Sequence, residues 1–356
     1  IKLLGLLLVV GLLFAAAPVG QAQAATICVN PGGTDGCFAS IQAAITAATA
    51  GDTITVAAGS YNENVIVDKS VTLTGAGRDV TTVTAVNTIE PVFRVTADGV
   101  TISGFTLTGA SGHQDEPFQD GDGINLDGAD NCVVTDNAFI ANRQGAYVTG
   151  SYNAFQRNII SNNFSNGVIL LGDNNTFDGN TIADNIKYGL NISTSNNTFI
   201  NNTITGNDGC GVALFGGTSG NTINFNAISG NTGAGGVYSI ASYTNDATKN
   251  WWGTATGPIH STNPGATGNK VTNVDYSPWL GFVPGTTPMD WYLNTTGTIQ
   301  DGIDAAANGE TIHVLAGTYV EDVVVTDKYF NLIGAVDTNG DPISILEGSL
   351  FINNPS

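Results

Sequence analysis

The stretch NNTFINNTITGNDGCGVAL, residues 196–214, places an asparagine every few positions, with Phe, Ile, Val and Leu between them. Asparagine is disfavoured inside helices and ordinary strands, because its amide competes for the hydrogen bonds of the backbone. A chain that mixes so many asparagines with apolar residues must therefore use them at repeated positions of one structure.

The middle of the chain repeats with a period of 22 residues. Its glycine markers are Gly123, Gly145, Gly167, Gly189 and Gly211. Its asparagine markers form three series: Asn131, Asn153, Asn175 and Asn197; Asn158, Asn180 and Asn202; and Asn163, Asn185 and Asn207. The runs between markers, such as GVIL and GLNI, alternate in polarity and are too short for helices. Each repeat is therefore predicted to hold three short strands.

This repeat resembles the right-handed parallel β-helix of the pectate-lyase-like superfamily. The resemblance implies an all-β fold with three short strands per coil of about 22 residues, and coils about 4.8 Å apart. Residues one coil apart then stack, which predicts inward columns at Phe155, Phe177 and Phe199, at Ile160, Ile182 and Ile204, and at Val168, Leu190 and Val212. A leucine-rich repeat shares the length and the asparagine ladder, but it requires a Leu-rich consensus that is missing here.

The asparagines are expected to stack at the corners of the coil. Asparagine tolerates the left-handed backbone conformation that a sharp corner needs, and stacked amides can form a hydrogen-bonded ladder. The glycines are expected to meet the same backbone need at another corner.

The segments around the repeats suggest four parts. Residues 1–24 are typical of a secretory signal peptide that is cleaved after Ala24. Residues 25–250 are predicted to be a β-helix whose open end is covered by a helix near residues 38–49. Residues 251–297, rich in aromatic residues, Gly and Pro, are predicted to be an end cap and linker. Residues 298–356 repeat the opening of the first array (Gly51 and Tyr61 match Gly309 and Tyr319) and are expected to be the truncated start of a second β-helix.

The charge and the amino-acid composition limit the classes of binding partner and the location of the chain. The chain has 10 Lys and Arg against 30 Asp and Glu, for a net charge of −20. This charge excludes the basic surface that nucleic-acid binding needs. The apolar run of the leader is too short to favour a membrane span, so none is expected in the mature chain. Export permits a disulfide, which is predicted between Cys28 and Cys37; Cys132 and Cys210 are expected to be small fillers.

Candidate site residues lie beside the glycine series. Arg143, Lys187 and Asp122 are the candidate catalytic groups, as a base or as charge partners of a uronate. Ligand-binding candidates are Tyr147, Tyr188, Asn125 and Asn191, at positions expected to face outward. The loop GASGHQDEPFQDGDG contributes a candidate calcium site formed by Asp115, Glu116, Asp120 and Asp122. The alternative interpretation is that this loop is polar only because it is solvated.

The sequence lacks the paired-Asp and Gly-His-Gly motifs of polygalacturonases and the Asp-Pro-His-Glu motif of alginate epimerases. Copper-maturation β-helix proteins have similar repeats, but copper needs clustered His, Met or Cys ligands that this sequence does not offer. We therefore expect an exported, cell-surface β-helix protein that binds glycans or neighbouring surfaces without catalysis. It requires no cofactor, with calcium as the one candidate. The alternative is a polysaccharide lyase or glycoside hydrolase of the same superfamily.

Overall fold

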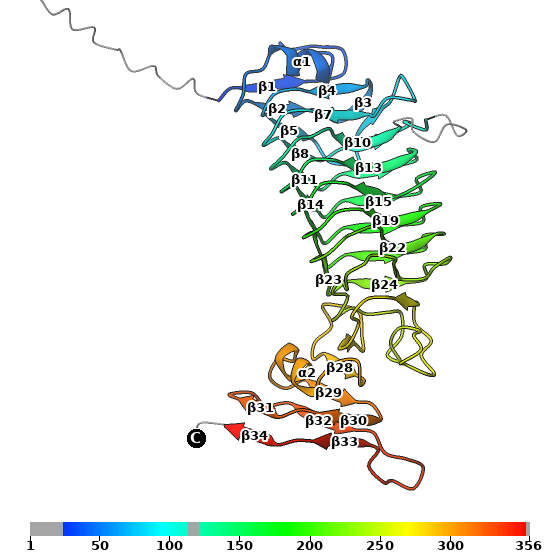
Figure 1. The fold of residues 1–356 in the computed structure, drawn as a ribbon. Helices are drawn as coiled ribbons and strands as arrows, with labels where there is room; N and C mark the ends of the chain where they lie inside the picture. The colour runs from blue at the N-terminus through cyan, green and yellow to red at the C-terminus, as the bar shows by residue number, and fades with distance from the viewer. Residues whose placement is uncertain (1–23, 113–120, 354–356) are drawn as a thin grey trace, which may run out of the picture.

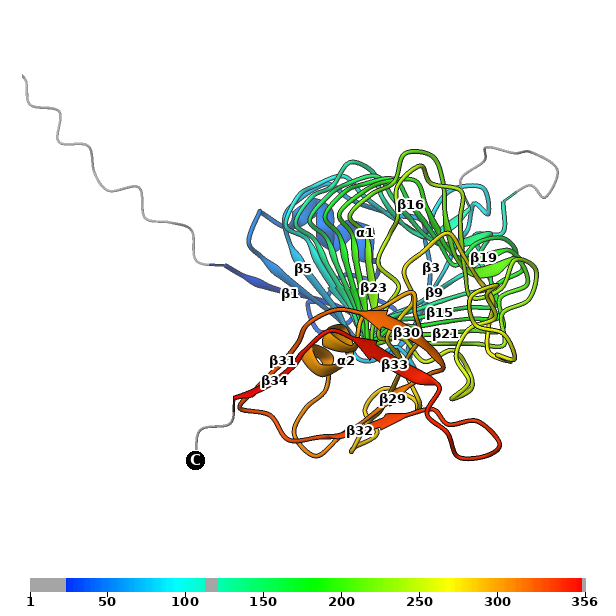
Figure 2. The same cartoon turned by 60° about the horizontal axis from the view of Figure 1, so that its bottom comes forward.

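The computed structural model describes residues 24–112 and 121–353, so most of the predicted leader lies outside the described residues. Three long parallel sheets, here called sheets A, B and C, wrap around one core, and each coil of the chain adds one strand to each sheet (Figure 1). Seen from below, the coils of this first array lie on one another (Figure 2). The predicted all-β right-handed parallel β-helix is confirmed.

Sheet A contains β1 (Thr26–Val29), β2 (Thr53–Val56), β5 (Thr72–Gly75), β8 (Thr101–Ser103), β11 (Val133–Thr135), β14 (Ala154–Gln156), β17 (Thr176–Asp178), β20 (Thr198–Ile200) and β23 (Thr222–Asn224). Sheet B contains β3 (Gly59–Asn62), β6 (Thr81–Thr84), β9 (Thr106–Thr108), β12 (Ala138–Ile140), β15 (Ile159–Ser161), β18 (Thr181–Ala183), β21 (Thr203–Thr205) and β24 (Ala227–Ser229). Sheet C contains β4 (Val65–Val67), β7 (Phe93–Val95), β10 (Asp122–Leu126), β13 (Gln144–Val148), β16 (Val168–Leu170), β19 (Tyr188–Ile192), β22 (Cys210–Leu214), β25 (Val237–Ser239) and β26 (Val271–Thr272).

The inward columns have the predicted register. Phe155 pairs with Phe177 and Phe177 with Phe199, and the rings of the two pairs stack with centroids 4.7 and 5.3 Å apart. The isoleucine column on sheet B and the Val/Leu column on sheet C pair in the same way and are fully buried. The period of the sequence therefore sets both the sheet register and the packing of the core.

Buried asparagines form three ladders, one at each corner of the coil. In each ladder, the backbone N–H of one asparagine donates to the Oδ1 of the asparagine one coil further on, as Asn153 does to Asn175 (2.8 Å) and Asn175 to Asn197 (2.8 Å). The first ladder continues through Asn221 to Asn245. The others are Asn137, Asn158, Asn180, Asn202, Asn226 and Asn250, and Asn142, Asn163, Asn185, Asn207, Asn231 and Asn269.

Two details of the predicted ladder are wrong. The coil before Asn153 is one residue shorter than the period, so Cys132 and not Asn131 occupies the ladder position, and the Cys132 N–H donates to Asn153 Oδ1 (2.8 Å). The ladder asparagines also do not adopt the left-handed conformation. The residue before each one does, except at Asn245 and Asn269; examples are Tyr152 (φ 59°), Arg157 (φ 51°) and Asn162 (φ 55°). At each such corner, one residue makes the left-handed turn and the next one makes the ladder hydrogen bonds, whereas we predicted that a single asparagine would do both.

The glycine series also acts differently from the prediction, because none of its members has a positive φ. A Cβ at Gly167 would lie 2.6 Å from the carbonyl oxygen of Gly189 and 2.9 Å from the ladder amide of Asn185. The same close approach recurs between successive members of the series. Glycine is therefore required because stacked coils approach too closely for a side chain.

Both arrays begin with a short helix held at its two ends by charged side chains. The first helix, α1 (Ile41–Ala47), lies over the start of the first array, as predicted (Figure 1). Glu63 accepts the N–H groups of Ile41 and Gln42 (2.8 and 3.0 Å), and Lys69 donates to three carbonyl groups at the other end of α1. These charges complement the dipole of the helix.

The second array repeats this arrangement. Its helix, α2 (Ile299–Ala305), is held by Glu321 at the start and Lys328 at the end. Its strands are β27 (Trp279–Leu280), β28 (Asp290–Leu293), β29 (Thr311–Val314), β30 (Gly317–Val320), β31 (Val323–Thr326), β32 (Asn331–Gly334), β33 (Ser344–Glu347) and β34 (Leu350–Asn353). The pairs β28–β29, β29–β32, β30–β33 and β31–β34 are parallel.

Aromatic side chains cover the end of the first array. Trp252, Tyr276 and Trp279 are at most 2% exposed and pack on its core, so they do not offer a flat platform to a sugar. Within the predicted end cap, β26 still pairs with β25. A separate buried cluster forms the core of the second array.

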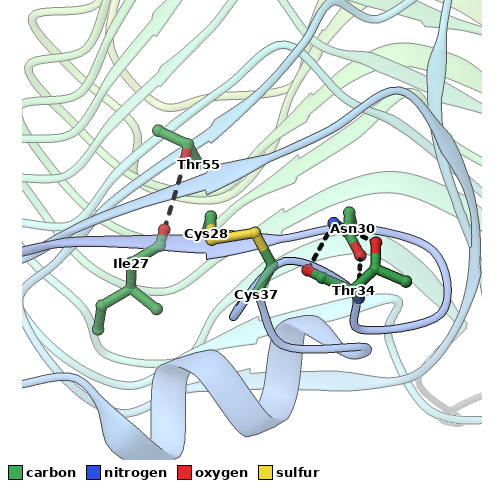
Figure 3. The surroundings of a disulfide bond; sticks show 6 residues. All are labelled: Ile27, Cys28, Asn30, Thr34, Cys37 and Thr55. Atoms are coloured by element: carbon green, nitrogen blue, oxygen red, sulfur yellow. Dashed lines mark hydrogen bonds between the residues drawn. A yellow bond between two sulfur atoms is a disulfide. The ribbon is translucent and has the colours of Figure 1, made fainter.

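The predicted disulfide between Cys28 and Cys37 is confirmed and closes the loop before α1 (Figure 3). Inside that loop, Asn30 exchanges hydrogen bonds with Thr34. Cys132 and Cys210 are buried free thiols. In the described part of the chain, we find no helix that is both long and apolar enough to cross a membrane.

Replacing one ladder amide tests the role of the ladders. Asn180 accepts from Asn158 and donates to the carbonyl of Phe155 and to Asn202, so Asn180→Leu leaves buried backbone groups without partners. We expect the free energy of unfolding, measured by denaturant titration, to fall by about 3 kcal/mol. The control Gln156→Ala, at a half-buried outer position, should change it by less than about 1 kcal/mol. Equal losses in both variants would contradict the ladder account.

A glycine substitution tests the close approach of the coils. Gly167→Ala should destabilise the protein by about 1–3 kcal/mol, because the added methyl group overlaps the Gly189 carbonyl oxygen. Gly217→Ala is the matched control, since nothing lies within 4 Å of its Cβ position and its φ is not positive. Thermal unfolding of the two variants compares them directly. A Gly167→Ala protein as stable as the control would show that the coils can separate at no cost.

Candidate functional site

The candidate residues lie on the outer face of sheet C. A Cβ at Gly145 would point at the core side chain of Ile160, so the residue before it, Gln144, faces outward. We call this surface the C face. It consists of two outward columns: Asp122, Gln144, Asn166, Tyr188 and Cys210; and Asn125, Tyr147, Ile169, Asn191 and Ala213. Strand pairing joins the second column residue by residue, and it pairs Asp122 with Gln144 and Tyr188 with Cys210 in the first.

The N-terminal part of the C face is buried although it points away from the core. Asp122 and Asn125 are 0% and 4% exposed, and the Asn125 amide donates to the Asp122 carboxylate (3.1 Å). The expectation that Asn125 offers an exposed amide to a ligand therefore needs correction. Its amide hydrogen serves the neighbouring carboxylate instead.

Arg143 and Lys187 lie along one edge of the C face, two coils apart as predicted. Arg143 is half-buried, and its Cδ lies 2.8 Å from where a Cβ of Gly112 would be. Its backbone N–H donates to the carbonyls of Ala110 and Gly121, so Arg143 sits where the acidic loop leaves and rejoins the array. Lys187 is exposed, and its backbone N–H donates to the carbonyl of Ser165.

The tyrosines and Asn191 form the accessible part of the C face. Tyr147, Tyr188 and Asn191 are half-buried, and Asn191 pairs in register with Ile169. The Tyr188 ring contacts the ring of Phe215 (centroids 5.7 Å apart, tilted by 53°). Tyr147 and Asn191 therefore stand in one column with only Ile169 between them.

The calcium prediction stays open. Asp115, Glu116 and Asp120 lie outside the described residues, and Asp122 is the only member of the set that the structure places. Among residues 24–112 and 121–353, no group of three or more His, Cys, Asp or Glu side chains is arranged to hold a metal ion.

Acid–base groups with a shifted pKa lie mostly away from the C face. Bonds from the backbone of Thr49 and Ala25 lower the pKa of Asp52 near α1, and the guanidinium of Arg157 lowers that of Asp136 at another corner. On the C face itself, burial raises the pKa of the Cys210 thiol to about 12. Cys210 is therefore protonated at neutral pH and is no nucleophile.

Sequence reasoning missed Gln144. It is 8% exposed, and its Oε1 is buried with no hydrogen-bond partner among residues 24–112 and 121–353. The residue type gave no signal, because glutamine at an outward position is ordinary. Only the three-dimensional neighbours make its carbonyl unusual.

A cavity of about 450 Å³ lies between the two arrays rather than on the C face. Its lining includes Asp246, Lys249, Asp275 and Asp301. Burial, together with Asp246 and Asp301, raises the pKa of the Asp275 carboxyl. The site predicted from the sequence and this cavity are therefore different places.

Comparisons with known proteins concern the fold. The catalytic domain of Agl-KA is 16% identical, with a TM-score of 0.52, and the alignment covers 90% of this chain and 66% of that one. Pectin methylesterase PemA from Erwinia chrysanthemi is 11% identical (TM-score 0.42, covering 93% and 92%). The A-module of mannuronan C-5 epimerase AlgE6 from Azotobacter vinelandii is 16% identical (TM-score 0.35, covering 87% and 94%). No curated protein sequence matches this chain.

A family model described as "right handed beta helix region" matches residues 91–252, the part that carries the asparagine ladders. This match agrees with the three parallel sheets and confirms the resemblance drawn from the repeats. Residues 91–252 thus match a right handed beta helix region, and the fold of the chain is a right-handed parallel β-helix.

Proposed function

We propose that this chain is an exported β-helix protein that binds glycan chains along the C face and leaves them intact. The observation that carries the proposal is the group of partly exposed side chains on the C face: Tyr147 on β13, and Tyr188 and Asn191 together on β19, two coils further on. Tyrosine rings offer an apolar face and a polar tip, which suits the C–H faces and hydroxyl groups of a sugar. Amides beside them can exchange hydrogen bonds with those hydroxyl groups.

Two features support a location outside the cytosol. The Cys28–Cys37 bond is of the kind that persists in oxidising compartments outside the cytosol. The leader expected at residues 1–24 would direct the chain there. A cell-surface location is part of the same proposal.

Binding is favoured over catalysis because the described part of the C face holds neither a histidine nor an ionised thiol. Both histidines that the structure describes, His260 and His313, lie in the end cap and the second array, beyond the C face. Cys210 is held protonated by its burial. A second candidate function, a lyase, is favoured by one observation: Arg143 and Lys187 share an edge of the C face beside Asp122.

Affinity electrophoresis against a neutral β-glucan, a xylan and polygalacturonate, with and without calcium, tests binding. Tyr147→Ala and Tyr188→Ala should each weaken retention of the bound glycan by up to about tenfold, through lost ring stacking. Tyr188→Phe should keep it. Tyr243→Ala, which removes an exposed tyrosine far along the chain, is the control. Retention that survives loss of both C-face rings would place binding elsewhere, and no retention by the wild type would refute the function.

Incubation with polygalacturonate and calcium separates binding from lyase chemistry. We expect no ultraviolet absorbance from an unsaturated uronide, since a chain with a net charge of −20 repels a polyanion at long range. Product that forms in the wild type and in Lys249→Ala, but not in Arg143→Ala or Lys187→Ala, would establish the lyase alternative. Those cations would then act as the base or neutralise the uronate.

A further inference from the structure

The carbonyl of Gln144 is out of place in an array where buried amides have partners. The side chain of each ladder asparagine both accepts and donates hydrogen bonds. For example, the backbone N–H and the side-chain amide of Asn158 both donate to Asn180 Oδ1, at 2.9 and 3.0 Å. Gln144 is also buried, at 8% exposure, yet its Oε1 has no hydrogen-bond partner among the described residues. Leaving a buried acceptor unpaired costs about 1–3 kcal/mol, so such groups usually await a water or a ligand.

The surroundings of this carbonyl indicate what kind of group it would accept. Gln144 pairs in register with Asp122, a buried carboxylate that already takes a hydrogen bond from Asn125. Two acceptors side by side favour a hydrogen-bond donor and repel an anionic group. The cationic side chains of Arg143 and Lys187 at the same edge disfavour an ammonium group.

We propose that Gln144 is a specificity-determining residue whose Oε1 accepts a hydroxyl group of a neutral glycan bound on the C face. The inference rests on the proposed glycan binding and adds the class of sugar. The bound sugar units are neutral and direct a hydroxyl group at Gln144 on β13. Uronates are disfavoured at this position, because their carboxylate would meet Asp122 and bring no donor to Gln144.

Gln144→Met tests the proposal, because it keeps the length of the side chain and removes the acceptor. The matched control is Gln156→Met, at a half-buried outer position of sheet A. Removing an unpaired buried acceptor should leave the thermal stability unchanged or raise it. The same change should weaken binding of the neutral β-glucan about fivefold to tenfold, while Gln156→Met binds as the wild type does.

A rise in stability together with lost binding is a combination that a purely structural glutamine would not produce. Gln144→Met that binds the β-glucan as tightly as the wild type would overturn this inference alone, and the carbonyl would then hold only a trapped water. Preference of the wild type for polygalacturonate over the β-glucan would also overturn it. Failure of the wild type to bind any glycan would instead refute the proposed function, and this inference with it.

Discussion

The stacked asparagine amide is the interaction on which the rest of the structure depends. A side chain buried at a corner must satisfy both its carbonyl and its amide hydrogens, and the backbone N–H one coil away must also find an acceptor. Stacking at about 4.8 Å satisfies all of these at once. Asn158, Asn180 and Asn202 do so with bonds between 2.8 and 3.0 Å. The left-handed residue before most of the ladder asparagines and the glycines of sheet C follow from the same close spacing.

This division of tasks leaves the outer positions available for function. The corners and the inward columns hold the array together, and the helices α1 and α2, each fixed by one glutamate and one lysine, cover the starts of the two arrays. The ladders hold neighbouring residues on the outer face of sheet C in register, but they do not depend on which side chains these residues carry. Tyr147, Asn191 and Gln144 are therefore positioned by the scaffold and are chosen for other reasons. A binding surface on this fold needs strands in regular register, so that its side chains are held in place, and varied outward residues, so that they can recognise a ligand.

The period of the sequence was enough to predict the sheets and the inward columns, and the expected export of the chain was enough to predict the disulfide between Cys28 and Cys37. The period pointed to Asn131, an asparagine 22 residues before Asn153, whereas the hydrogen bond from Cys132 to Asn153 shows that this coil is one residue short. The period also could not separate the left-handed residue from the ladder residue, since both tasks suit asparagine. The burial of Asn125 and the unpaired carbonyl of Gln144 depend on contacts across neighbouring coils, which no one-dimensional pattern records.

Hydrogen exchange of the ladder amides tests the central claim most directly. If the ladders hold the coils together, the backbone N–H groups of Asn153, Asn158, Asn175 and Asn180 should be among the slowest to exchange and should open with one shared free energy, that of global unfolding. The N–H groups of exposed residues in the turns, such as Gly217, should exchange much faster. Ladder amides that exchange as fast as the turns, or each with its own free energy, would contradict the account and locate the stability of the array in its apolar core alone.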